Sequence, residues 1–222
     1  MSLQPSKTDP ALGHEVEAYL QKKGVATPTN HSLLALDDQD KILQIQKHYT
    51  EIMNILGLDL SDDSLEETPK RVAKMMVSEQ MWGLRPENFP KATVIDNKMN
   101  YDEMVVEKGI TVMSLCEHHL VVIDGKAKVA YIPDKKVLGL SKMNRIVAYF
   151  AHRPQVQERL TEQVFHALQY LLDTDDIAVV IQGVHYCVKS RGVEDSTSST
   201  TTSKLGGRFR EEPSLRAEFF SV

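Results

Sequence analysis

The hydrophobic pattern of this 222-residue chain changes period part-way along it, and that change constrains the fold more than any other feature. Over residues 39–56 the apolar residues recur every three or four positions, which is the spacing of an α-helix. Residues 105–115 and 120–132 are rich in β-branched residues instead, and Ala127 and Val129 alternate with lysines. The middle of the chain is therefore predicted to form strands.

Helical spacing returns over residues 141–151 and 156–172, and strand character returns over residues 177–188. This order of elements favours an α+β fold with an antiparallel sheet over a doubly wound parallel sheet. Asp124-Gly125 has the composition of a hairpin turn. Ser196 to Ser203 consists only of Ser and Thr, so it is either a flexible linker or a strand, and its four threonines favour the strand.

Composition excludes several classes of protein. The 26 Lys and Arg against 31 Asp and Glu give a net charge of −5, whereas proteins that coat nucleic acid carry a basic surplus. Apolar runs such as Ile177 to Ile181 fall short of the ~20 residues of a membrane helix. Met1 to Pro10 is polar, unlike a secretory signal, and two cysteines do not make a disulfide scaffold. We expect a cytoplasmic protein without nucleic-acid or membrane partners.

Both cysteines lie within two residues of a histidine, which points to a metal site. The two-residue gap between Cys116 and His119 lets both side chains reach one ion. On a strand, His185 and Cys187 point to the same face. If the segments meet, Cys116, His119 and Cys187 supply three ligands and leave a fourth position for water, as in a catalytic zinc site. The alternative is that both cysteines are ordinary core residues.

His118 and His185 remain once this ligand set is chosen. A histidine pKa of about 6.5 suits proton transfer at neutral pH. Beside an open metal site, the two histidines are candidates for a general acid and a general base. The alternative is that they support the metal ligands through hydrogen bonds.

Paired cations recur along the chain. Ser141 is a predicted helix cap, and cations in the first turn after it oppose the helix dipole unless an anion lies nearby. Each pair alone suits a solvated face, but several together predict a polyanionic ligand such as a nucleoside triphosphate. The pairs are Arg71 and Lys74, Lys142 and Arg145, and Lys189 and Arg191.

Gln157 and Glu158 lie early in the predicted helix over residues 156–172, and Glu158 is off its apolar stripe. Such a glutamate is usually plain surface. A carboxylate can, however, accept two parallel N–H bonds from the N1 and exocyclic amine of guanine, which adenine does not offer.

Several segments together resemble the signature segments of the GTP cyclohydrolase I family, in the expected order. The resemblance extends from about Ile42 to Phe220 and is to the zinc-dependent branch of this activity. The matching segments are Glu66–Lys74, Cys116–His119, Gly139–Arg145, Arg153–Arg159 and His185–Cys187.

The resemblance implies a tunnelling fold, in which an antiparallel sheet has helices packed on one side and subunits join edge to edge into a ring. We expect an N-terminal helical region over residues 1–60 and a catalytic domain over residues 61–222. Family members are typically homodecamers, dimers of pentamers, with active sites at subunit boundaries. The implied reaction converts GTP and water to formate and 7,8-dihydroneopterin triphosphate, the first step of tetrahydrofolate or pterin biosynthesis.

The resemblance also implies residue roles. Zinc held by the two cysteines and His119 supplies hydroxide to C8 of the purine. His185 protonates the imidazole nitrogen as the ring opens, and His118 acts later on the ribose, assisted by Ser141. Gln157 and Glu158 hold the guanine edge. The implied triphosphate ligands are Arg71, Lys74, Lys142, Arg145 and Arg191.

A protein of another class fits part of the same pattern, namely a zinc-stabilised module that sequesters a nucleotide without turning it over. The open ligand position and the two spare histidines favour the enzyme.

Overall fold

The computed structural model describes residues 5–222 and combines helices and strands. The α-helices are α1 (Pro10–Lys22), α2 (His31–Leu34), α3 (Asp38–Ile55), α4 (Thr68–Lys74), α5 (Leu140–Ala151), α6 (Gln157–Leu172), α7 (Tyr186–Lys189), α8 (Gly207–Glu211) and α9 (Pro213–Ser221). The strands are β1 (Val94–Asp96), β2 (Val105–Cys116), β3 (Val122–Tyr131), β4 (Lys136–Leu138), β5 (Pro154–Gln155), β6 (Ile177–His185) and β7 (Thr200–Leu205). A π-helix, η2, spans Met75–Gln80, and 3-10 turns span Pro5–Lys7, Trp82–Leu84 and Pro86–Asn88.

Five strands form the main sheet in the order β5-β2-β3-β6-β7. The pairs β2–β3, β3–β6 and β6–β7 are antiparallel, whereas the short β5 runs parallel to β2. The predicted α+β fold with an antiparallel sheet is thus confirmed, with β5 as the exception. The strand interpretation of the Ser/Thr run is confirmed from Thr200 onward, and Ser196 to Ser199 precede the strand.

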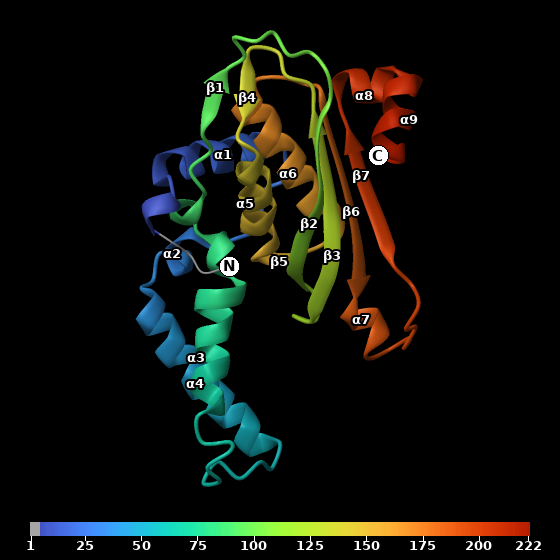
Figure 1. Ribbon diagram of the computed structural model, residues 1–222. Helices are drawn as coiled ribbons and strands as arrows, with labels where there is room; N and C mark the ends of the chain where they lie inside the picture. Colours follow the sequence, from blue (N-terminus) through green and yellow to red (C-terminus); the bar gives the residue numbers. More distant parts are fainter. Residues whose placement is uncertain (1–4) are drawn as a thin grey trace.

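Each face of the sheet has its own apolar cluster, because alternate residues of a strand face opposite sides. Val129 and Val179 lie in the main core with α1, α5 and α6. Ala130 and Ala178 lie in a second cluster with Phe209 and other residues of α8 and α9, on the other side of the sheet (Figure 1). The prediction that helices pack on one side is therefore wrong for the C-terminal helices, which are too short to show a clear helical period.

The predicted hairpin turn at Asp124-Gly125 is also wrong. Both residues lie inside β3, where Asp124 pairs with Met113 of β2. The chain reverses before β3 instead, where Leu120 adopts a φ of 52° and its N–H donates to the carbonyl of Cys116 over 2.8 Å. Glycine is needed at position 125 for another reason. A β-carbon there would lie 2.4 Å from the carbonyl oxygen of Gln182, so only glycine lets β6 lie this close to β3.

Helices α3 and α4 pack against each other and extend away from the sheet (Figure 1). The predicted helix over residues 39–56 forms, but several apolar residues toward its C-terminal end have little cover within one chain. Met53 is buried, whereas Ile52, Ile55 and Leu56 are 46%, 84% and 69% exposed. Exposed apolar patches of this kind mark contact surfaces.

Helix α1 belongs to the main core, where Val16 and Leu20 are buried. Residues 1–4 of the predicted N-terminal region lie outside the described residues, and the boundary near residue 60 stays a prediction. None of the helices over residues 5–222 has the length and apolar character that a membrane span requires.

Candidate metal centre and nucleotide site

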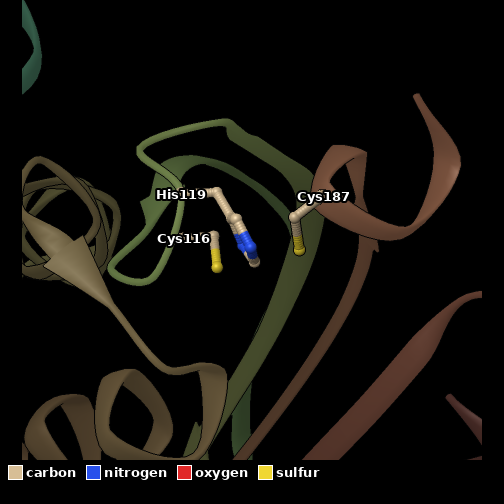
Figure 2. Close-up of side chains that lie close together, drawn as sticks. All are labelled: Cys116, His119 and Cys187. Carbon is tan, nitrogen blue, oxygen red and sulfur yellow. The ribbon is translucent and has the colours of Figure 1, made fainter. Parts of the chain in front are cut away.

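Two cysteines and one histidine meet at one end of the sheet (Figure 2). Cys116 is the last residue of β2, His119 lies in the turn that follows, and Cys187 lies on α7. One possible ligand atom from each residue lies within 4.8 Å of the other two. Two sulfurs and one imidazole nitrogen at this separation fit zinc, which such ligands bind at about 2.0–2.3 Å.

The predicted route by which Cys187 reaches the cluster is wrong. Strand β6 ends at His185, and residues from Tyr186 onward turn into α7. His185 and Cys187 therefore do not lie on the same strand as expected. The helical turn nevertheless brings the Cys187 thiol beside that of Cys116.

Cys116 is held by the short strand β5. It pairs with Gln155, and the N–H of Glu117 donates to the Gln155 carbonyl over 3.0 Å. The carboxylate of Glu117 in turn accepts a hydrogen bond of 2.5 Å from Arg159 on α6. The turn that carries His119 is thus fixed to the start of α6. Sequence reasoning missed Glu117 and Arg159, although both lie inside the segments that carried the family resemblance.

The short connection between α5 and β5, residues 152–153, is held in the core by Arg153. The guanidinium of Arg153 is buried, donates to the hydroxyl of Thr27 over 3.0 Å and to the carbonyl of Gly83, and stacks on Tyr149 and Phe150. These contacts fix the path of the chain into β5 and so the position of Cys116.

The electrostatics of the cluster oppose a free thiolate at Cys187. Burial raises the pKa of the Cys187 thiol, and the adjacent Cys116 thiol raises it further. Metal binding must therefore displace a proton there. Arg191 lies at the same place, and its guanidinium donates to Nε2 of His119 over 2.7 Å.

His185 lies half-buried beside the start of α6. Its Nε2 is 2.8 Å from Oε1 of Gln157, and burial lowers the pKa of its imidazole while the nearby Glu158 carboxylate opposes that shift. Glu158 itself is exposed. His118 is 64% exposed, with Nδ1 3.9 Å from the sulfur of Cys116. The predicted histidines and the predicted guanine ligands thus lie on segments that meet at the cluster.

Two groups of predicted residues lie elsewhere in the chain. Ser141 and Lys142 are in the first turn of α5. The last turn of α5, at Ala151, is the end from which the chain continues toward Cys116, and about 15 Å of helix separates it from Ser141. The predicted Ser141 cap is wrong, because α5 starts one residue earlier, Gly139 is its N-cap, and Ser141 makes no capping bond. Arg145 follows one turn along α5. Arg71 and Lys74 are exposed on α4, in the arm that extends from the sheet (Figure 1).

The fold and the cluster define a candidate metal-dependent protein, in which the residues predicted to transfer protons and those predicted to bind an anion lie on separate parts of the chain. The profile of the GTP cyclohydrolase I family matches residues 45–222. This chain belongs to that family.

Curated proteins with the family's name are similar to this chain along nearly its whole length. "GTP cyclohydrolase 1" of Shewanella sp. (strain ANA-3) is 58% identical over 207 residues, covering 93% of this chain and 95% of the relative. The proteins of the same name from Photobacterium profundum and Vibrio parahaemolyticus are 58% and 59% identical, with 92% of this chain and 94% and 93% of their own lengths covered. A solved chain of the archaeosine synthase QueF-Like in the apo form covers 48% of this chain and 94% of its own length at 16% identity, with a TM-score of 0.36, too distant to support an argument.

Proposed function

We propose that this member of the GTP cyclohydrolase I family hydrolyses and rearranges GTP to formate and 7,8-dihydroneopterin triphosphate, with zinc as its metal. The observation that carries the proposal is the meeting of Cys116, His119 and Cys187 at the same end of the sheet as His185 and Glu158. Such a site combines a metal position, a proton carrier and a carboxylate suited to guanine within one chain.

Cys116, His119 and Cys187 would hold the zinc ion. When bound, zinc lowers the pKa of a water molecule to near neutrality and so supplies the nucleophile for hydrolysis. Three protein ligands leave one coordination position open, as catalytic sites require. The fixed path of β5 and the Glu117–Arg159 ion pair hold two of these ligands in place.

The chain's own residues divide the proton transfers. His185, half-buried, protonates the imidazole nitrogen of the purine as the ring opens. His118, on the exposed turn, acts later on the ribose. Ser141 lies away from the cluster of its own chain, so it would assist that rearrangement from a neighbouring subunit.

Substrate is held from both ends. Glu158 accepts the N1–H and the exocyclic amine of guanine through its two oxygens. Cations hold the triphosphate through charge-assisted hydrogen bonds, and Arg191 is the one already at the metal cluster. The other proposed triphosphate ligands are Lys142, Arg145, Arg71 and Lys74.

Glu158→Gln is expected to weaken GTP binding about 10-fold or more, because the amide presents a donor to a guanine donor. Zinc content should stay the same. Equilibrium dialysis of GTP, with zinc measured by mass spectrometry, checks both. The matched control is Glu162→Gln one turn along α6, where the carboxylate binds Lys204 and not the cluster. Equal GTP affinity in Glu158→Gln and wild type would show that Glu158 is an ordinary surface residue that does not bind guanine.

We further propose that the subunits form the ring of a tunnelling fold, a homodecamer built from two pentamers. Two features support this assembly. Strand β2 has β5 beside it only at Leu115 and Cys116, and β7 has one strand partner, β6, among the described residues, so both edges are open to pairing. The uncovered apolar surface of α3 offers a second contact.

A shared active site follows, because Arg71 and Lys74 lie on the arm rather than at the cluster of their own chain. Cys116→Ala and Arg71→Ala are each expected to be inactive. In mixed oligomers about one quarter of the sites would join an intact metal set to an intact arginine of a neighbour, so about one quarter of wild-type activity should return. Co-expression with two tags and tandem purification gives the mixed species.

The control for this experiment pairs Cys116→Ala with His185→Ala. Both changes lie in the cluster of one chain, so no site in the mixed oligomer is intact and activity should stay at the level of the parents. Mixed oligomers of Cys116→Ala and Arg71→Ala that show no recovery would place the arginine and the metal set in the same chain.

A further inference from the structure

Gln157 was predicted to bind guanine, but its side chain is already hydrogen-bonded to other residues of the chain. Its side chain is 1% exposed. The two N–H groups of the carboxamide are shared among three acceptors, the carbonyl of Ile181 at 3.0 Å, the carbonyl of Thr200 at 3.0 Å and the hydroxyl of Thr202 at 3.1 Å. Its oxygen lies 2.8 Å from Nε2 of His185. Both ends of the amide are thus engaged within the chain.

These partners fix which way the amide points. An amide nitrogen only donates, and the carbonyls of Ile181 and Thr200 only accept, so the nitrogen must face β6 and β7. The amide oxygen must then face His185, and because that oxygen only accepts, Nε2 of His185 must carry a proton. Nδ1, the other ring nitrogen, makes no hydrogen bond to any residue over the described range 5–222.

Two further features hold Gln157 in this position. The hydroxyl of Thr161 lies 2.7 Å from that of Thr202 and donates to the carbonyl of Gln157 over 3.0 Å, which ties α6 to β7. Gly183 on β6 leaves the space that the amide needs, because a β-carbon there would lie 2.8 Å from Oε1 of Gln157.

We propose that Gln157 is a positioning residue for His185 rather than a ligand of the guanine base. It holds the ring in one orientation with Nε2–H donating to the amide oxygen. Nδ1 is then the ring nitrogen that takes up a proton and passes it to the substrate. The proposal rests on the proposed function, because it needs His185 to transfer a proton during GTP turnover.

The test compares Gln157→Leu, His185→Ala and the double variant, with Gln169→Leu as the matched control. Gln169 is on the same helix and its amide binds His166 and Asp175, away from the cluster. Product formation gives kcat and KM. Because His185→Ala is expected to turn over slowly, dialysis of GTP in that background compares GTP affinity with and without Gln157. Zinc content and oligomer size are measured for every variant.

We expect Gln157→Leu to lower kcat about 10-fold or more with KM within about twofold, since it disturbs a group that contributes about 10²–10⁴-fold. The double variant should be no slower than His185→Ala, because a residue that acts through another adds nothing once that other is gone. GTP affinity in the His185→Ala background should not change. Gln169→Leu should behave as wild type.

A guanine ligand would give the opposite pattern. A rise in KM of about 10-fold at unchanged kcat, or a further loss of GTP affinity in the double variant, would overturn the proposal. If Gln157→Leu does not fold, Gly183→Ala decides. Its β-carbon would lie 2.8 Å from Oε1 of Gln157 and so displace the amide oxygen from His185, which should lower kcat alone. A wild type without GTP turnover contradicts the proposed function instead, which separates the two failures.

Discussion

Cys187→Ala should abolish zinc binding at stoichiometric metal and reduce GTP turnover to background. The thiol is one of three ligand atoms that lie within 4.8 Å of one another, so its loss leaves two protein ligands. Loss of a mere supporting partner costs about 10–100-fold in metal affinity, and loss of a ligand should cost more. Zinc per chain is measured by mass spectrometry after dialysis against a weak chelator.

The control for this variant is Ser190→Ala, just after α7, where the side chain binds only the carbonyl of Tyr186 in the described structure. It should retain zinc and activity. The Cys187→Ala oligomer should stay assembled, because the residue is neither in the main core nor on the open strand edges. Full zinc occupancy in Cys187→Ala would show that the ligand set is wrong.

His185→Ala is expected to differ from Cys187→Ala in its metal content. Zinc should be retained, whereas turnover should fall about 10²–10⁴-fold. The imidazole of His185 binds Gln157 and lies outside the ligand group of Cys116, His119 and Cys187. Its removal takes away a proton carrier without removing a ligand. The same zinc assay, paired with single-turnover kinetics, separates loss of metal from loss of chemistry.

His166→Ala is the matched control for His185→Ala, since His166 is also half-buried but bonds to Gln169 and Glu162 along α6. It should leave both zinc and turnover near wild type. Zinc and activity lost in equal proportion in His185→Ala would assign the imidazole of His185 to the metal instead of to proton transfer.

Local pattern was enough to predict the elements that build the core. The alternation along β3 and the helical stripe of α6 follow directly from the need to bury one face, and Leu160, Val164 and Leu168 are buried as expected. Asp124-Gly125 shows where composition fails. Its glycine is required by the close approach of Gln182 on β6, a contact between strands that a local reading does not contain.

The metal cluster was predictable as a set, but its geometry was not. Cys116 and His119 are close in sequence, so their spacing alone indicates a shared ion. Cys187 reaches them through a helical turn after His185, not along a strand. The Glu117–Arg159 ion pair depends on how the start of α6 lies against the turn after β2, and the amide of Gln157 depends on how α6 packs against β6 and β7. Only tertiary structure reveals these contacts.

The exposed arm marks another limit of local reasoning. The stripe on residues 39–56 correctly predicts a helix, because the period is local. Whether Ile55 and Leu56 are covered by the same chain or by another is a question about assembly, and within one chain they remain exposed. For the same reason, sequence alone did not show that Arg71 lies away from the cluster of its own chain.

The most direct test of the account is the fate of GTP with the purified oligomer. We expect one formate per GTP consumed and a pterin that becomes fluorescent after oxidation. A chelator should prevent the formation of both products, and added zinc should restore it. GTP that binds tightly but is recovered intact, with zinc bound and no formate released, would contradict the account and identify a nucleotide-binding module instead of an enzyme.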